Sequence, residues 1–149
     1  MKVKIILFSL SLFLFTGIGF AQKKNKGPKS FISETVTISK YHNKSELASM
    51  QKGELITLYS ERIQVLVRTL PYVAFATKPG ITMATLGIPT NNDNKKALDG
   101  QFESTDDYLK SAGEFHSEYL PYSDTGNLIA GILFYEEIMK SLHQYNDFR

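Results

Sequence analysis

LITLYSERIQVLVRTLPYV, residues 55–73, is the stretch that decides the fold of this chain. Its apolar residues recur at steps of three and four, at Leu55, Tyr59, Ile63 (or Arg62), Leu66, Leu70 and Val73. This spacing predicts an amphipathic helix with one apolar stripe. Pro71 falls inside the pattern and has no N–H to donate to the carbonyl of Val67, so the helix must kink or end there.

Two further stretches downstream carry the same helical spacing. One stripe comprises Leu98, Phe102, Thr105, Leu109, Ala112, His116 and Tyr119, and the other comprises Leu128, Ile132, Tyr135, Met139 and Leu142. A second Leu-Pro-Tyr triplet, residues 120–122, separates them, and we expect it to join two helices, whereas the first triplet interrupts one. Between residues 82 and 89, Thr82 as N-cap and Gly87 as left-handed C-cap predict a single helical turn.

These elements predict an all-α fold. Short connections between long helices favour antiparallel neighbours, so residues 45–149 are expected to form an antiparallel three-helix bundle. Its first helix is kinked or broken at Pro71, and a short capping helical turn lies in the first connection. We expect Leu66, Leu109 and Ile132 at the centre of the core, because each lies in the middle of its apolar stripe.

The N-terminus predicts export. Residues 1–21 combine a basic start, an apolar run of about a dozen residues and small residues before Ala21, which is typical of a secretory signal peptide. A membrane anchor is the alternative, but a spanning helix needs roughly 20 apolar residues. The expected product is periplasmic or secreted and has no membrane span after signal cleavage.

Residues 22–44 are predicted to form a flexible basic arm. The arm carries six lysines and one glutamate, whereas the chain after it carries nine basic and fourteen acidic residues. Within it, residues 31–41 (FISETVTISKY) alternate β-branched and polar side chains, which favours a strand-like segment. Its backbone must find hydrogen bonds in residues 72–77, in a second copy of the chain, or at the sheet edge of a partner.

The motifs of common enzymes are missing from the sequence. Without cysteine, disulfides, thiolate metal sites and cysteine nucleophiles are excluded. No nucleophile elbow, phosphate loop or dinucleotide fingerprint is present, and none of the histidines belongs to a metal-binding motif. We therefore predict no catalytic residue, no metal and no cofactor. An enzyme stays open as an alternative, because bundle sites assemble across helices.

Two sets of side chains are candidates for binding. The first, for a protein or envelope partner, comprises Ile32, Val36, Ile38, Asp99, Glu103, Asp106 and Asp107. The second, for a small ligand, comprises Tyr59, Tyr108, His116 and Tyr135. Nucleic acid is not expected, because the cations of the arm are all lysine and few aromatic residues accompany them.

The sequence thus favours a non-enzymatic exported interaction or structural module. Its expected partner is a protein, an envelope surface or a second copy of the chain. A small ligand- or metal-binding helical bundle is the alternative function.

Overall fold

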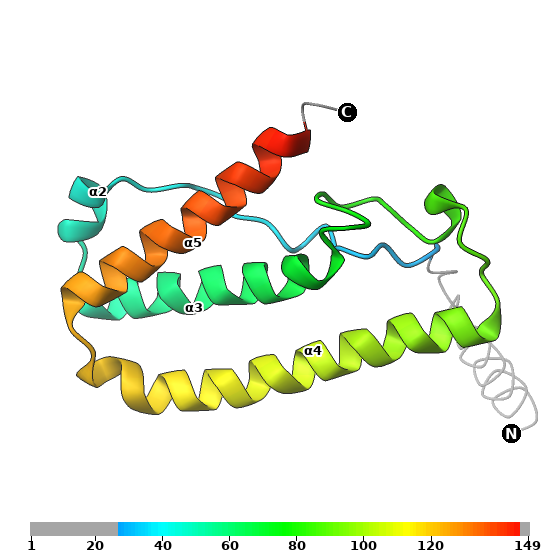
Figure 1. Ribbon diagram of the computed structural model, residues 1–149. Coiled ribbons are helices and arrows are strands. Elements are labelled where there is room, and N and C mark those ends of the chain that lie inside the picture. The colour runs from blue at the N-terminus through cyan, green and yellow to red at the C-terminus, as the bar shows by residue number, and fades with distance from the viewer. Residues whose placement is uncertain (1–26, 147–149) are drawn as a thin grey trace, which may run out of the picture.

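A computed structural model of the protein describes residues 27–146 (Figure 1). Three long helices dominate it: α3 (Lys52–Thr69), α4 (Asn92–Tyr119) and α5 (Thr125–Asn146), preceded by the short helix α2 (Lys44–Ala48). Consecutive long helices run in opposite directions (Figure 1). Because residues 27–146 contain no β-strand, the predicted all-α antiparallel bundle is confirmed. The predicted signal peptide lies outside the described residues.

Local capping explains where the helices begin. The Asn43 side chain accepts a hydrogen bond from the Glu46 N–H at 2.9 Å, and the Glu46 carboxylate accepts one from the Asn43 N–H at 2.9 Å. Asn91 caps α4 in the same way, since its side chain accepts from the Asn94 N–H at 2.8 Å. Asp124 accepts from the N–H of Gly126 at 2.7 Å at the start of α5. Such caps satisfy N–H groups that the helix itself leaves unpaired.

The two Leu-Pro-Tyr triplets form the same local structure. α3 ends at Thr69, and Leu70–Tyr72 follows as one turn of 3₁₀ helix, which confirms the predicted break at Pro71. Leu120–Tyr122 forms an equivalent 3₁₀ turn after α4. Both triplets therefore end a long helix, and no α-helix resumes directly after the first one. We expected the first triplet to interrupt a helix and the second to join two helices, but the backbone has the same form at both.

The predicted helical turn in the first connection is also present. Ala84–Leu86 forms a 3₁₀ turn that ends at Gly87, whose φ of 69° is left-handed. The Ile88 N–H donates to the Met83 carbonyl at 2.9 Å, and the Thr82 hydroxyl accepts from the Thr85 N–H at 3.3 Å. Glycine adopts the left-handed conformation without the steric cost that a Cβ brings.

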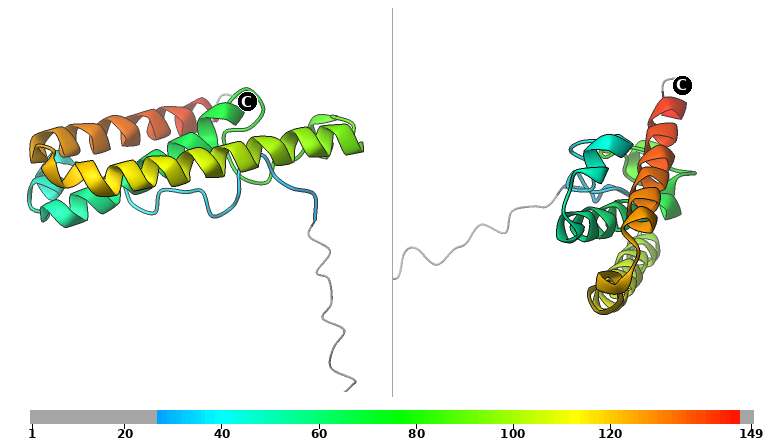
Figure 2. Two further views of the ribbon diagram at one scale, coloured as in Figure 1. Left: turned by 90° about the horizontal axis from the view of Figure 1, so that it is seen from below. Right: turned by 90° about the vertical axis from the view of Figure 1, so that its left-hand side faces the viewer.

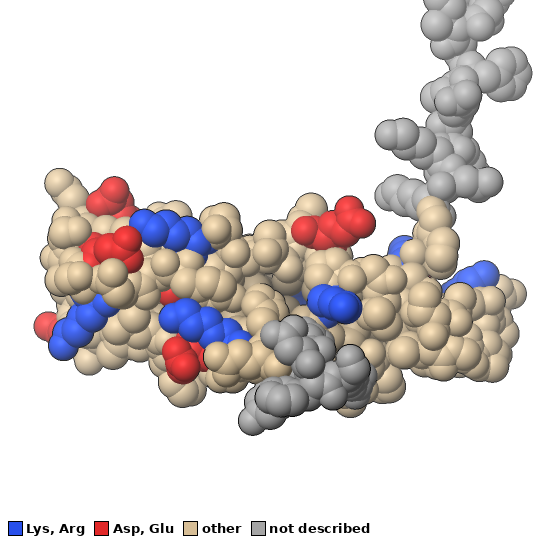
Figure 3. All heavy atoms as spheres, turned by 90° about the horizontal axis from the view of Figure 1, so that it is seen from above, with Lys and Arg blue, Asp and Glu red and all other residues tan. Residues whose placement is uncertain are grey.

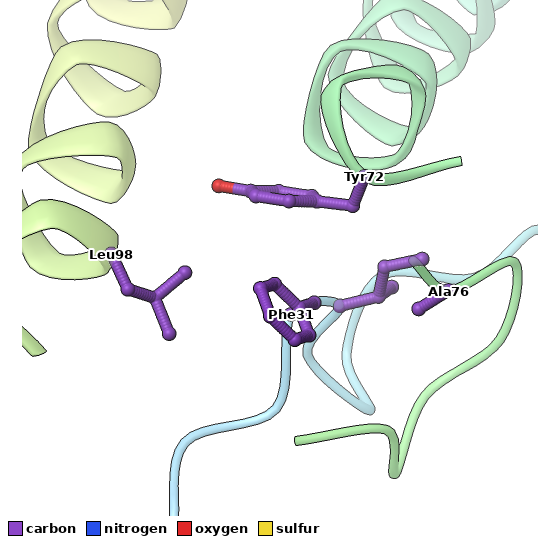
Figure 4. Close-up of a cluster of buried hydrophobic side chains, with 5 residues drawn as sticks. Phe31, Tyr72, Ala76 and Leu98 are labelled. Atoms are coloured by element: carbon purple, nitrogen blue, oxygen red, sulfur yellow. The ribbon is translucent and has the colours of Figure 1, made fainter. Parts of the chain in front are cut away.

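The core consists of three apolar clusters along the bundle. The first comprises Phe31, Ile32, Tyr72, Ala76 and Leu98 (Figure 4); the second Ile38, Val65, Leu66 and Met139; the third Leu47, Leu55, Leu128 and Ile132. Leu66 and Ile132 are buried as expected, but Leu109 is only half-buried. The expectation for Leu109 is wrong because α4 diverges from α5 and buries only Leu98 and Thr105 (Figure 2).

Residues 31–41 do not form the predicted strand. A single antiparallel bridge joins Ser30 to Thr82, where the Phe31 N–H donates to the Ile81 carbonyl at 2.9 Å. Beyond this bridge, the extended segment (residues 30–43) runs along the bundle beside α3 (Figure 1). Its apolar side chains Ile32 and Ile38 are buried in the core clusters. Packing against helices, instead of pairing with a strand, therefore holds this segment in place.

Candidate functional site

A buried polar cluster of His42, Arg62 and Glu136 links three parts of the molecule. The Arg62 Nε and Nη2 donate to Glu136 Oε1 at 3.0 and 2.8 Å, which joins α3 to α5. The His42 N–H donates to Glu136 Oε2 at 2.6 Å, and His42 Nδ1 lies 3.0 Å from Glu136 Oε1. Arg62 Nη2 also donates to the Lys40 carbonyl at 2.8 Å. The cluster thus fixes the extended segment to both helices.

Hydrogen bonds and charge keep Glu136 ionised in this cluster. Burial on its own raises the pKa of Glu136, but the hydrogen bonds from His42 and Arg62 and the guanidinium charge outweigh it and hold that pKa below its ordinary value. Arg62 Nη1 lies 3.1 Å from Glu61 Oε1, an ion-pair distance without hydrogen-bond geometry. Because Arg62 is 1% exposed and Glu136 is fully buried, the cluster is a structural connection with no access for a ligand.

The cluster was not predicted from the sequence, although the sequence contains a signal for it. Arg62 was only an alternative to Ile63 in the first stripe, and Glu136 was not assigned to the core. Both lie at core positions: Arg62 four residues before Leu66, and Glu136 four residues after Ile132. Charged residues at core positions of two neighbouring helices predict a buried ion pair, because an unpaired buried charge is strongly destabilising.

The structure brings the predicted ligand-binding residues together. The hydroxyls of Tyr59 and Tyr135 are 3.1 Å apart and their ring centroids 5.4 Å apart. The His116 ring meets the Tyr59 ring edge-on at a centroid distance of 5.8 Å. The pKa of Tyr135 is raised to about 12, and burial is the largest cause. The hydrogen bond with Tyr59 and the charges of Tyr59 and Tyr108 raise it further.

Tyr59 packs against both His116 and Tyr135, whereas Tyr108 is 57% exposed. The Tyr59 ring lies directly on α5 at Gly131, where an added Cβ would be only 2.7 Å from Tyr59 Cε2. A cavity of about 480 Å³ lies instead at the start of α4 and is lined by Lys29, Met83 and Leu98 among others. Tyr59, His116 and Tyr135 therefore form an aromatic contact between α3, α4 and α5.

The predicted interaction residues of the extended segment are used within the chain. Ile32 and Ile38 are buried and Val36 is half-buried, so all three contribute to the bundle. A partner could reach the two isoleucines only if the segment left the core.

The predicted acidic residues of α4 divide into two groups. Asp99 forms an ion pair with Lys29, and Asp106 forms one with Arg68 at 2.7 Å. Glu103 and Asp107 are exposed to solvent. The face that carries α5 and the extended segment shows acidic and basic side chains interspersed (Figure 3), so the acidic character is not concentrated there.

A surface that sequence reasoning did not identify lies on α4 and α5. We call it the aromatic flank: Tyr108, Phe115 and Tyr119 of α4 and Phe134 of α5. Each of these side chains is more than half exposed, with Phe115 at 59% and Phe134 at 63%. The Phe115 and Tyr119 rings stack at a centroid distance of 4.6 Å. Tyr119 was expected in the core stripe, and the error arises because the stripe of α4 is wider than the surface that α3 covers.

An apolar depression extends the aromatic flank along α5. It has a volume of about 270 Å³ and is lined by Phe134, Glu137, Ile138, Ser141 and Leu142. Phe134, Ile138 and Leu142 are four residues apart and therefore follow one side of the helix. The flank thus continues as an apolar row over two turns of α5.

Among residues 27–146, no three histidine, aspartate or glutamate side chains are placed so that they could hold a metal ion. None of the helices in that range has the length and hydropathy of a membrane-crossing segment. Comparisons with known protein families, with curated proteins and with solved structures find no match to this chain. The surface of the protein itself therefore provides the observations that bear on its function.

Proposed function

We propose that this protein is an exported, non-enzymatic interaction module that binds a protein partner through the aromatic flank. The observation that carries the proposal is the exposure of four large aromatic side chains on neighbouring helices. Single exposed apolar residues are ordinary, but a contiguous patch is typical of a binding surface. Tyrosine and other large aromatic residues are also enriched where protein interfaces gain most of their affinity.

The interior beneath the flank supports this proposal. Tyr59 and Tyr135 are hydrogen-bonded to each other directly under the exposed rings, and the Phe134 ring contacts the Tyr135 ring at 5.8 Å. The buried polar cluster further connects α3 and α5. A binding surface on helices held in this way loses little conformational entropy when a partner docks.

The leader sequence supports the exported location. With residues 1–21 removed, the mature chain begins at Gln22, a product that intact mass of the exported protein identifies. A product that keeps Met1 and fractionates with membranes contradicts this part of the proposal.

Site-directed photo-crosslinking in cells that export the protein tests the binding surface. A photo-reactive amino acid at position 115 should yield a discrete crosslinked adduct. The same amino acid at position 86 is a matched control, because Leu86 is an exposed apolar residue outside the flank. An adduct at both positions, or at neither, would contradict the assignment of function to the aromatic flank.

A further inference from the structure

We infer that the aromatic flank binds a cationic amphipathic helix of its partner, which lies between the diverging helices α4 and α5. This inference rests on the proposed function and specifies the chemistry of the partner. It follows from the shape of the flank, from its length and from the charges that border it.

The shape of the flank fits a helix. α4 and α5 meet at the second Leu-Pro-Tyr turn and diverge from there (Figures 1 and 2). Tyr108, Phe115 and Tyr119 are separated by seven and four residues and so share one side of α4. That side lies near α5, because His116, next to Phe115, meets the Tyr59 ring, which also lies against Tyr135 and Gly131 of α5. Two apolar rows on diverging helices offer the kind of spaced anchor sites on which an amphipathic helix docks.

The length of the flank matches about three helical turns. Residues 108 to 119 span roughly 16 Å of α4 at 1.5 Å per residue. Residues 134 to 142 span about 12 Å of α5 by the same measure. A bound helix with apolar side chains at i, i+3 or i+4, and i+7 covers such a distance.

A row of carboxylates borders the aromatic residues of α4. Asp107 directly precedes Tyr108, Glu114 precedes Phe115, and Glu118 precedes Tyr119. Neighbouring residues of a helix point about 100° apart, so the three exposed acids form their own row beside the rings. Lys110 is the only lysine or arginine between residues 103 and 119. On α5, Glu137 borders the depression with a side chain that is 72% exposed, and the Lys140 ammonium lies 3.8 Å from its carboxylate.

The carboxylate row of α4 determines which partner the aromatic flank favours. A helix with lysine or arginine beside its apolar face brings opposite charge to the carboxylate row of α4, which speeds encounter and fixes orientation. A second copy of this chain would bring the acidic rows of two α4 helices towards each other, and like charges oppose such pairing. An anionic membrane surface is disfavoured for the same reason.

A synthetic peptide provides a direct test with the mature protein. The probe is a helical peptide of about 18 residues, built from leucine and lysine with one tryptophan on its apolar face. The protein contains no tryptophan, so tryptophan fluorescence reports on the peptide alone. We expect a blue shift on binding, an affinity that decreases with added salt, and no binding of the same peptide with glutamate in place of lysine.

Variants decide whether the peptide occupies the flank. The double variant Phe115→Ala/Phe134→Ala should weaken binding by about tenfold or more, because aromatic anchors carry much of the energy of an interface. Leu86→Ala is the matched control and should leave the dissociation constant unchanged, while circular dichroism verifies that both variants keep their helices. Glu114→Gln/Glu118→Gln should weaken binding and reduce its dependence on salt.

Several outcomes would overturn the inference. These are equal binding by the flank variant and the Leu86→Ala control, equal binding of the glutamate peptide, or no binding at all. A dimer in sedimentation that is lost in Phe115→Ala would assign the flank to a second copy of the chain. A crosslinked adduct at position 115 together with failure of the peptide would refute the cationic helix and leave the proposed function intact.

Discussion

The two Leu-Pro-Tyr turns have the same local sequence but lie in different environments. Both end a long helix in a 3₁₀ turn, and the residues before them, Thr69 and Tyr119, have similar φ angles of −108° and −103°. The tyrosines differ: Tyr72 is 4% exposed, whereas Tyr122 is 87% exposed. The triplet therefore determines the backbone, and distant parts of the chain determine whether its tyrosine is buried.

The extended segment accounts for the difference. Phe31 of that segment packs on Tyr72 at a ring distance of 5.9 Å (Figure 4). Phe102 of α4 meets the same ring at 5.8 Å. Burial by these neighbours raises the pKa of Tyr72. In the part of the chain that the structure describes, no comparable segment covers Tyr122. The extended segment thus covers the first turn, while the aromatic side chain of the second turn stays exposed.

The largest expected effect concerns the polar cluster that fixes the covering segment. Glu136→Ala leaves Arg62 buried without its carboxylate, and removal of one partner from a buried ion pair costs about 3–5 kcal/mol. The free energy of unfolding from urea denaturation measures this loss. Glu137→Ala is the matched control, since its exposed side chain predicts a change within about 0.5 kcal/mol. Similar losses in the two variants would show that the cluster does not hold the segment.

Substitution of the two tyrosines tests the comparison directly. Tyr72→Ala should lower the free energy of unfolding by about 3 kcal/mol or more, because it removes a buried aromatic side chain from the first core cluster. Tyr122→Ala should change it by less than about 0.5 kcal/mol, as expected of an exposed position. Thermal unfolding followed by circular dichroism measures both. A comparable loss for Tyr122→Ala would mean that the second turn is also covered in solution.

The same contrast explains what the sequence could predict. The helices, their caps, the break at Pro71 and the left-handed Gly87 all depend on residues within a few positions of one another. The polar cluster joins residues 94 and 74 positions apart, so helical spacing alone could not reveal it. Apolar spacing predicted Tyr59, His116 and Tyr135 as neighbours. It could not show that the side of α4 that carries Phe115 would lie outside the contact with α3.

Acidity should destabilise the fold through Glu136 of the polar cluster. The pKa of Glu136 in the folded protein lies below its ordinary value, so its carboxylate stabilises the fold above the unfolded pKa of about 4.3. This contribution decreases as the pH falls below that value and is lost once the pH passes the folded pKa. Urea denaturation between pH 7 and pH 3 should show a steeper loss for the natural chain than for Glu136→Gln. Parallel pH profiles would contradict the assignment.

The smallest expected effects come from two glycines, one in each region of the molecule. Gly87, in the turn beside the covering segment, has a left-handed φ of 69°, so Gly87→Ala should destabilise the fold by about 1 kcal/mol. Gly113 lies within α4, and a Cβ added there meets nothing within 4 Å. Gly113→Ala should therefore stabilise the protein by about 0.5–1 kcal/mol, because alanine restricts the unfolded chain and favours the helix. Differential scanning calorimetry of both variants measures the two shifts in melting temperature. Opposite signs support a fixed turn at Gly87 and an open helix surface at Gly113, whereas destabilisation by Gly113→Ala would show that α4 is packed against something at that position.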